Sequence, residues 1–124
     1  MAEGGPRVLL VDDDLQIREF LEDALADEGF EVRTAATGRA ALEALAEWRP
    51  GLILLDLRMP DMNGWEFRAQ QRAQPEVASI PVIVTTAGTS SQEDLASLAA
   101  DAIVPKPFDL DELMATVRRC LGES

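Results

Sequence analysis

The stretch GLILLDLRMPDMNG, residues 51–64, runs four apolar side chains straight into a carboxylate and then into a loop that contains a proline and ends at a glycine. An unbroken apolar run such as 52–55 is typical of a parallel strand with both faces buried. Asp56 comes directly after this run, and a charge in that position needs a partner or a function. The stretch therefore predicts a buried strand that places Asp56 at one edge of a sheet.

Strand-like and helix-like patterns alternate along the whole chain. Apolar runs at 7–12, 80–85 and 102–104 favour three more strands, and the alternating segment 30–34 favours a half-buried edge strand. Helical spacing, capping residues and Gly or Pro stops predict the intervening helices. We expect helices from Leu15 to Gly29, from Thr37 to before Pro50, from Gly64 to Gln74, onward from Ser90 or Ser91, and from Asp109 to Gly122.

Five strands alternating with five helices imply βα units and a parallel sheet that is covered on both faces. Only segment 30–34 alternates, so we expect it at an edge and the other four strands to be buried on both faces. The right-handed crossover rule then predicts the strand order 2-1-3-4-5, a flavodoxin-like (βα)5 three-layer α/β sandwich. We expect a single domain over residues 1–124, with 1–6 as a flexible N-terminal tail.

Composition excludes several classes of function. A formal net charge of −12 argues against nucleic acid as a partner, because phosphate binding depends on Lys and Arg. No apolar run is long enough to span a membrane, and MAEGGPR lacks the character of a secretory signal, so we expect a cytoplasmic protein. The single cysteine, Cys120, rules out an internal disulfide and is interpreted as a packing residue. The absence of histidine removes histidine bases and imidazole metal ligands.

Polar residues lie directly after the apolar runs. Asp12, Asp13 and Asp14 come after the first, and the later runs lead into Asp56, into the pair Thr85–Thr86, and into Pro105–Lys106. In a parallel sheet these positions share the carboxyl edge, where such folds bind ligands next to the point at which the winding reverses. Lys106 is the only lysine, which favours a site that needs a compact point charge.

This set of side chains suits phosphoryl chemistry. Carboxylates gathered at one edge repel one another by roughly 3 kcal/mol for a pair at about 5 Å. An oxygen-loving divalent cation such as Mg²⁺ would relieve that repulsion and usually takes one or two carboxylates together with phosphate oxygens and waters. A hydroxyl and an ammonium are donors suited to phosphoryl oxygens. The pattern therefore indicates an aspartate that accepts phosphate.

Four motifs in order resemble the receiver domain of two-component response regulators. They are VDDD at 11–14, LLDLRMPDMNG at 54–64, PVIVTTA at 81–87 and PKPF at 105–108, and together they span nearly the whole chain. The resemblance implies that Asp56 is the phosphoacceptor and that Lys106 contacts the phosphoryl group. It implies a Mg²⁺ site, in which Mn²⁺ can substitute, formed by Asp56, by Asp13 directly, by Asp12 through water, and by the backbone carbonyl of Arg58.

The resemblance also implies a switch. Thr86 matches the hydroxyl that moves on phosphorylation in the family, and Lys106–Pro107 is expected to be a cis peptide. Ile103 stands where the family usually carries Tyr or Phe, so the usual aromatic switch is not expected here. Gly88 and Arg58 lie at positions that tune the lifetime of the phosphorylated state in the family. The small glycine at position 88 is expected to leave the site open to water or a partner.

The expected function is a stand-alone phosphoryl acceptor that labels itself stoichiometrically and is not a turnover enzyme. Its expected partners are a sensor histidine kinase or a histidine phosphotransfer protein, and an output protein that contacts the face formed by helix 4, strand 5 and helix 5. Neither nucleic acid nor a membrane is expected as a partner.

Three other interpretations stay open at this point. Asp12 and Asp13 could cap the first helix, as Asp14 is expected to do. A pseudo-receiver that binds partners without taking phosphate is the main functional alternative. The third is a haloacid dehalogenase-type phosphatase, whose D-x-D motif Asp12-x-Asp14 mimics, although that family carries Thr or Val where this chain has Leu15 and Gln16.

Overall fold

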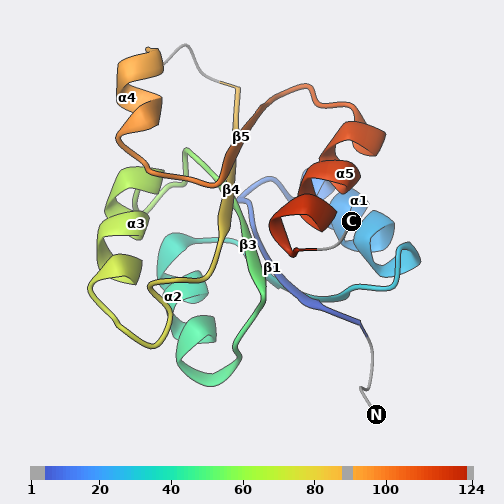
Figure 1. The fold of residues 1–124 in the computed structure, drawn as a ribbon, viewed down its shortest axis with the longest axis horizontal. Coiled ribbons are helices and arrows are strands. Elements are labelled where there is room, and N and C mark those ends of the chain that lie inside the picture. Colours follow the sequence, from blue (N-terminus) through green and yellow to red (C-terminus); the bar gives the residue numbers. More distant parts are fainter. Residues whose placement is uncertain (1–4, 88–90, 123–124) are drawn as a thin grey trace.

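The protein forms a five-stranded parallel sheet with helices on both faces (Figure 1). The structure is a computed structural model, and it describes residues 5–87 and 91–122. The strands are β1 (Arg7–Val11), β2 (Glu31–Ala35), β3 (Leu52–Asp56), β4 (Val82–Thr86) and β5 (Ala102–Pro105). The helices are α1 (Leu15–Asp27), α2 (Gly38–Glu47), α3 (Gly64–Arg72), α4 (Gln92–Ala96) and α5 (Leu110–Cys120).

The strand order is β2-β1-β3-β4-β5, which confirms the predicted 2-1-3-4-5 arrangement. Helices α1 and α5 cover one face of the sheet, and α2, α3 and α4 lie on the other (Figure 1). Val11 pairs with Leu55, and Asp56 with Thr85, so the carboxyl ends of the central strands lie side by side. Next to them Thr86 pairs with Pro105, which brings the end of β5 to the same edge.

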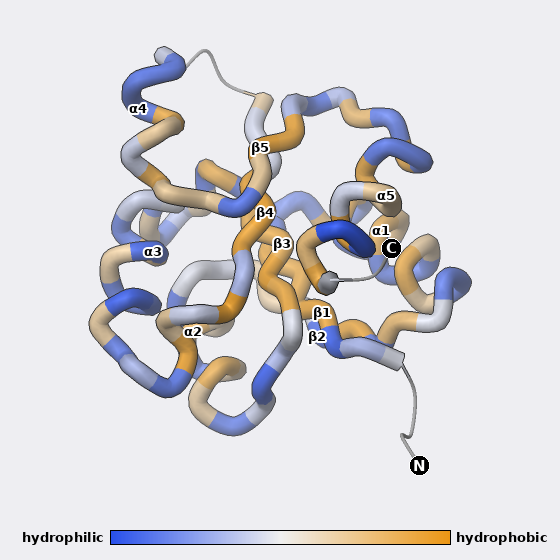
Figure 2. Tube along the Cα trace, in the orientation of Figure 1, coloured by the Kyte–Doolittle hydropathy of each residue, from blue (hydrophilic) through white to orange (hydrophobic). Residues whose placement is uncertain are grey.

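The core lies on both sides of the sheet, as expected for parallel strands. Leu9, Ile53 and Val84 face the α2–α4 side, and the next residues along β1 and β3, Leu10 and Leu54, face the α1–α5 side. Every residue of β3 and of β4 is buried. Figure 2 shows this central sheet as the most hydrophobic part of the trace. The unbroken apolar runs in the sequence are explained by this burial on two faces.

The prediction for β5 was wrong in one respect. We expected this strand to be buried on both faces, but its residues Ala102–Val104 are only partly buried and Pro105 is exposed. The reason is its position, because β5 forms the second edge of the sheet and pairs only with β4. A run of three apolar residues does not distinguish an edge strand from a central one.

Side-chain caps define the helix starts. Asp14, Thr37 and Asp109 cap α1, α2 and α5 as predicted, and Ser91 caps α4. Asn63, which the sequence analysis did not single out, caps α3 and forms a capping box with Glu66. The alternative start of α4 at Ser90 lies outside the described residues. None of the helices in the described part of the chain is long and apolar enough to cross a membrane.

Candidate functional site

The carboxyl edge of the sheet brings together side chains that are far apart in the sequence. Asp56 is the last residue of β3 and Thr86 the last of β4, and both are buried. Asp12, just past β1, is also buried, and its backbone N–H donates to the carbonyl of Ala35. The backbone N–H of Lys106 donates to the carbonyl of Thr86 over 2.7 Å, so the end of β4 holds the start of the loop after β5.

Lys106 lies between two of the acids. Its Nζ donates to Asp12 Oδ2 at 3.1 Å and to Asp56 Oδ1 at 3.4 Å. The three side chains are only 15%, 3% and 10% exposed, for Lys106, Asp12 and Asp56 respectively. Burying both charges costs solvation that offsets much of their attraction, but removing one partner would leave an uncompensated buried charge. The structure therefore confirms that Asp12, Asp56 and Lys106 come together at this edge, as predicted.

Asp13 completes an acidic cluster with Asp12 and Asp56. One carboxylate oxygen from each residue lies within 4.8 Å of the other two, and Asp13 is exposed while the other two are buried. Asp12 is held in place, because its Oδ1 accepts from the N–H of Asp14 and its carbonyl accepts from Arg18. Hard oxygen ligands on one open side are the donor set that Mg²⁺ prefers, so these residues fit such an ion.

Burial and the neighbouring acid raise the pKa of Asp56 from 3.8 to about 6. Loss of solvent is the largest cause, and repulsion from the Asp12 carboxylate adds to it. Lys106 and a backbone hydrogen bond from Arg58 act in the opposite direction and lower the pKa. A carboxylate with a raised pKa in a cleft is a common mark of a functional site.

The pKa of Lys106 lies above its ordinary value. Burial alone would lower it, but the carboxylates of Asp56 and Asp12 outweigh that effect and raise it. The ammonium is therefore fully charged at neutral pH, and it is available to neutralise whichever anionic oxygen lies beside Asp56.

Asp61 has a role that the sequence analysis missed. Its two carboxylate oxygens accept from the backbone N–H groups of Gly38 and Arg39, at 2.9 and 2.8 Å, at the first turn of α2. These hydrogen bonds lower the pKa of the Asp61 carboxyl. Beside them, a Cβ on Gly38 would lie 2.3 Å from Cγ of Met62, so a larger residue there would displace the Met62 side chain. The loop after Asp56 is thus fixed to α2.

The remaining predicted residues lie around the same edge or outside the described chain. The Lys106–Pro107 peptide is cis, as expected. Ile103 packs against the core on the α2–α4 side and is partly buried. Arg58 forms a bridge with Asn63 inside the loop after β3, and the role of its carbonyl as a metal ligand stays a prediction. Gly88 lies outside the described residues.

Comparison with known proteins identifies the family that shares this arrangement. The sequence model of the response regulator receiver domain matches residues 8–118. The chain belongs to this family. The matched family is the one that the four sequence motifs resemble. This receiver domain has the fold and the acidic edge that the sequence motifs predicted.

Relatives and solved structures agree with the assignment. Response regulator MprA of Mycolicibacterium vanbaalenii is 41% identical over 117 residues, which are 93% of this chain and 50% of that protein. The receiver domain thus spans about half the length of the curated relatives it matches.

Chemotaxis response regulator CheY4 of Vibrio cholerae is 35% identical, with a TM-score of 0.85 over 93% of this chain and 98% of that one. Response regulator TrrA of Thermotoga maritima, solved with Mg²⁺ and BeF, is 36% identical, with a TM-score of 0.83 over 94% of this chain and 99% of that one.

Proposed function

We propose that this receiver domain accepts a phosphoryl group on Asp56 from a phosphohistidine donor, in a reaction that requires Mg²⁺. The observation that carries the proposal is the position of Lys106 Nζ between the carboxylates of Asp12 and Asp56, next to the end of β4 where Thr86 lies. One nucleophilic carboxylate, two further acids, a hydroxyl and an ammonium meet at a single edge. This is the set of groups that phosphoryl transfer to a carboxylate requires.

Each residue has a chemical task in this proposal. A carboxylate oxygen of Asp56 attacks phosphorus in line, the P–N bond of the phosphohistidine breaks, and its electron pair returns to the departing imidazole. The raised pKa of Asp56 indicates that its negative charge is poorly compensated, so transfer onto a better neutralised product is favoured. Lys106 moves from a carboxylate oxygen to a phosphoryl oxygen, and the Thr86 hydroxyl donates to another.

Asp12, Asp13 and Asp56 would hold Mg²⁺, together with the carbonyl of Arg58, and Mn²⁺ would be an acceptable substitute. The ion would supply charge neutralisation for the phosphoryl oxygens. Asp12 and Asp13 lie directly after β1, and the hydrogen bond from Arg18 to the Asp12 carbonyl fixes the first of them. The loop that carries Arg58 is fixed at its far end by Asp61. Asp12 and the loop that carries Arg58 are therefore held before the ion binds.

The donor would approach over an apolar hollow next to Lys106. Ile17 and Phe20 of α1 and Ala87, Pro107 and Phe108 line this hollow of about 390 Å³. Apolar contacts there would position a histidine kinase or a phosphotransfer protein with its phosphohistidine above Asp56. We propose a cytoplasmic signalling protein that is labelled once per phosphorylation event and does not turn over substrate as an enzyme.

The output depends on the connections of Thr86 and Lys106. A phosphoryl group adds a charge of about −1.5 to −2 at neutral pH, and it would draw both side chains inward. Because the N–H of Lys106 donates to the carbonyl of Thr86, the ends of β4 and β5 would move together. The face formed by α4, β5 and α5 would then change for a partner protein. Ile103 would move with them without the ring flip of an aromatic residue.

Labelling with radioactive acetyl phosphate tests the proposal. The wild-type protein should incorporate up to one phosphoryl group in the presence of Mg²⁺ and none after chelation, whereas Asp56→Asn should incorporate none. Asp27→Asn, an exposed acid at the end of α1, is the matched control and should label normally. Labelling of the Asp56→Asn variant at the wild-type level, or an unlabelled wild type, would refute the assignment. The second result would support the pseudo-receiver alternative.

A further inference from the structure

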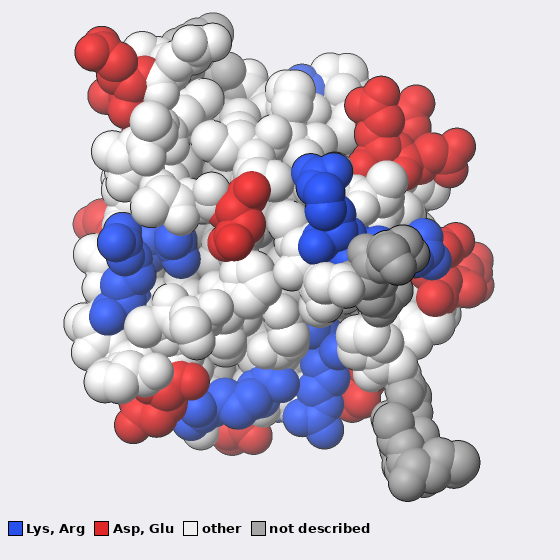
Figure 3. All heavy atoms as spheres, in the orientation of Figure 1, with Lys and Arg blue, Asp and Glu red and all other residues white. Residues whose placement is uncertain are grey.

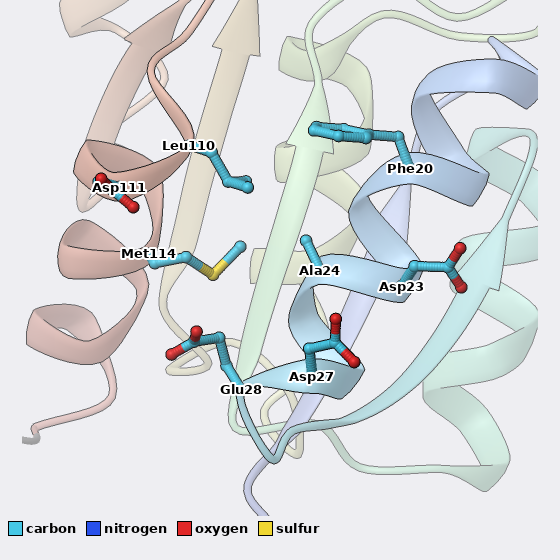
Figure 4. Close-up of a pocket in the computed structure, with 8 residues that line it drawn as sticks. All are labelled: Phe20, Asp23, Ala24, Asp27, Glu28, Leu110, Asp111 and Met114. Atoms are coloured by element: carbon cyan, nitrogen blue, oxygen red, sulfur yellow. The ribbon is translucent and has the colours of Figure 1, made fainter.

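Helices α1 and α5 line a groove of about 310 Å³ that shares only Phe20 with the hollow proposed for the phosphodonor (Figure 4). Its floor is apolar and is formed by Phe20 and Ala24 of α1 and by Leu110 and Met114 of α5. Phe20 is 55% exposed and, with Leu15, is one of two large apolar side chains that the described chain leaves open to solvent. An exposed aromatic ring in the lining of an apolar groove is typical of an interaction surface.

Carboxylates line both sides of this groove. Asp23 and Asp27 project from α1 one turn apart, and Asp111 stands on α5 across the gap (Figure 4). Among the described residues none of these three forms an ion pair. Glu28 pairs with Arg118 at the lower end of the groove, between the two helices. Figure 3 shows acidic side chains gathered on the side of the molecule where α1 and α5 lie.

We propose that the α1–α5 groove is a docking site for a basic amphipathic helix of a partner protein. The apolar floor takes one row of aliphatic side chains, spaced at i, i+3 or i+4 and i+7 along the partner helix. Lys and Arg side chains on either flank of that row then meet Asp23 and Asp27 on one side and Asp111 on the other. Charge of one sign on both rims selects a cationic partner and speeds its association.

Other occupants fit this groove less well. An extended peptide that adds a strand needs an open sheet edge, whereas the groove walls are helices whose backbone groups are already paired. A second copy of this chain docked on the same face would place acids against acids, because a twofold interface uses the same patch on both molecules. Nucleic acid is repelled by the same carboxylates.

The groove is separate from the phosphorylation chemistry. None of its acids contacts Lys106 or belongs to the cluster of Asp12, Asp13 and Asp56. Occupation of the groove is therefore not expected to require the phosphorylated state. The inference goes beyond the proposed function, and it stands even if Asp56 accepts no phosphate.

A synthetic helix tests the proposal. The probe is a fluorescein-labelled Leu/Lys amphipathic peptide of about 18 residues, long enough for five turns, and binding is measured by fluorescence anisotropy. Saturable binding is expected, weakening as salt is added, with no binding of the Leu/Glu version of the same peptide. Asp23→Lys combined with Asp27→Lys should weaken binding about ten-fold or more, because both rim charges on α1 are reversed.

The matched control is Glu19→Lys combined with Glu22→Lys. Both residues are exposed on α1 and do not line the groove. Their replacement changes the net charge by the same amount as the Asp23→Lys and Asp27→Lys pair. This variant should bind within about two-fold of the wild type, since it changes only the screened long-range field. Backbone amide shifts on binding should cluster in the second half of α1 and the first half of α5.

Three outcomes would overturn the proposal. They are an absence of saturable binding, equal weakening by the two double variants, and amide shifts centred outside the groove. Self-association of the chain through this face, detected by sedimentation, would also count against it. Labelling by acetyl phosphate is measured on the same variants, because it reports on Asp56 independently of the groove.

Discussion

At the scale of single residues, Lys106 is the residue on which the site depends. It donates to both Asp12 and Asp56 at low exposure, and so it offsets the repulsion between two buried carboxylates. That compensation is incomplete, because the pKa of Asp56 is still raised to about 6. The protein therefore keeps an incompletely compensated carboxylate at the position where phosphate is proposed to bind.

The raised pKa of Asp56 gives a pH dependence of stability. A group that holds its proton more tightly when folded stabilises the fold at low pH, and this contribution is lost as the pH rises from about 4 through about 6. The full loss is at most about 3 kcal/mol. In urea unfolding without Mg²⁺, Asp56→Asn should gain stability relative to the wild type across this window. If the free energies of unfolding of the two proteins changed in parallel between pH 4 and 7, the result would contradict the raised pKa of Asp56.

Asp61 stabilises the loop after β3. Asp61→Ala removes a carboxylate that accepts from two backbone N–H groups at the start of α2, so it should lower the free energy of unfolding by about 1 kcal/mol. Because the pKa of Asp61 is lowered, this stabilisation is present at neutral pH and disappears as the pH falls through that pKa. Amide exchange at Gly38 and Arg39 should accelerate. The exposed control Glu22→Ala should change stability by less than about 0.5 kcal/mol.

At the scale of elements, α3 holds α4 through side chains. Buried Arg68 of α3 donates to the carbonyls of Leu98 and Ala99, just past the end of α4, and to Oε1 of Gln71. Gln71 in turn donates to the carbonyls of Val77 and Ile80 before β4. Ala99 has a φ of 53°, an unusual conformation for a residue with a Cβ, and the hydrogen bond to its carbonyl helps to fix it.

Replacing Arg68 should loosen this connection. Arg68→Met keeps the aliphatic stem but leaves two carbonyls and the Gln71 side chain without their donor, so the free energy of unfolding should fall by about 2–3 kcal/mol. Chemical denaturation measures the loss. Arg72→Met, on the exposed side of the same helix, is the matched control and should cost less than about 0.5 kcal/mol. Equal effects of the two variants would show that the buried network is not stabilising.

Trp65 offers a reporter on the same pair of helices. Its indole N–H donates to Ser97 Oγ at 2.7 Å and to the carbonyl of Asp94, so the ring senses the position of α4. If phosphorylation moves α4, the emission of Trp65 should change in a Trp48→Phe background when beryllofluoride and Mg²⁺ are added together. The Asp56→Asn version of that protein is the control and should show no change.

The elements were predicted well where the pattern is local. Apolar runs and caps such as Asp14 and Thr37 are encoded within a few residues, and the strand order is set by general rules of connection. The half-buried state of β5 was not predictable from Ala102–Val104, because it depends on which strand lies beside it. The Arg68 network was also missed, since two of the acceptors of Arg68 are backbone carbonyls about 30 residues away, which have no signature in sequence.

At the scale of the whole molecule, the sheet topology explains why the site could be predicted. Asp12, Asp56 and Lys106 are distant in sequence, but parallel strands place all their carboxyl ends at one edge. The placement of Asp61 against α2 could not be foreseen in this way, because it joins two loops and not two strand ends. Motif spacing thus identified the acids and the lysine, whereas packing between loops had to be observed.

Binding of Mg²⁺ should stabilise the whole fold. An ion that binds only the folded state adds about 2.7 kcal/mol to the free energy of unfolding at a hundred times its dissociation constant. Thermal melts with increasing MgCl₂ should therefore shift upward for the wild type. Asp13→Asn removes one exposed member of the cluster, and this variant should lose most of the shift while keeping its stability in chelator. A wild-type melting temperature independent of Mg²⁺ would contradict the metal site.

Phe20 borders two hollows at once, the one beside Lys106 and the groove between α1 and α5. Two partners that each bury this ring would compete for it. Binding of a phosphodonor and binding of a helix in the groove would therefore exclude each other. The order in which they arrive, and not only their affinities, would then decide whether a signal is received.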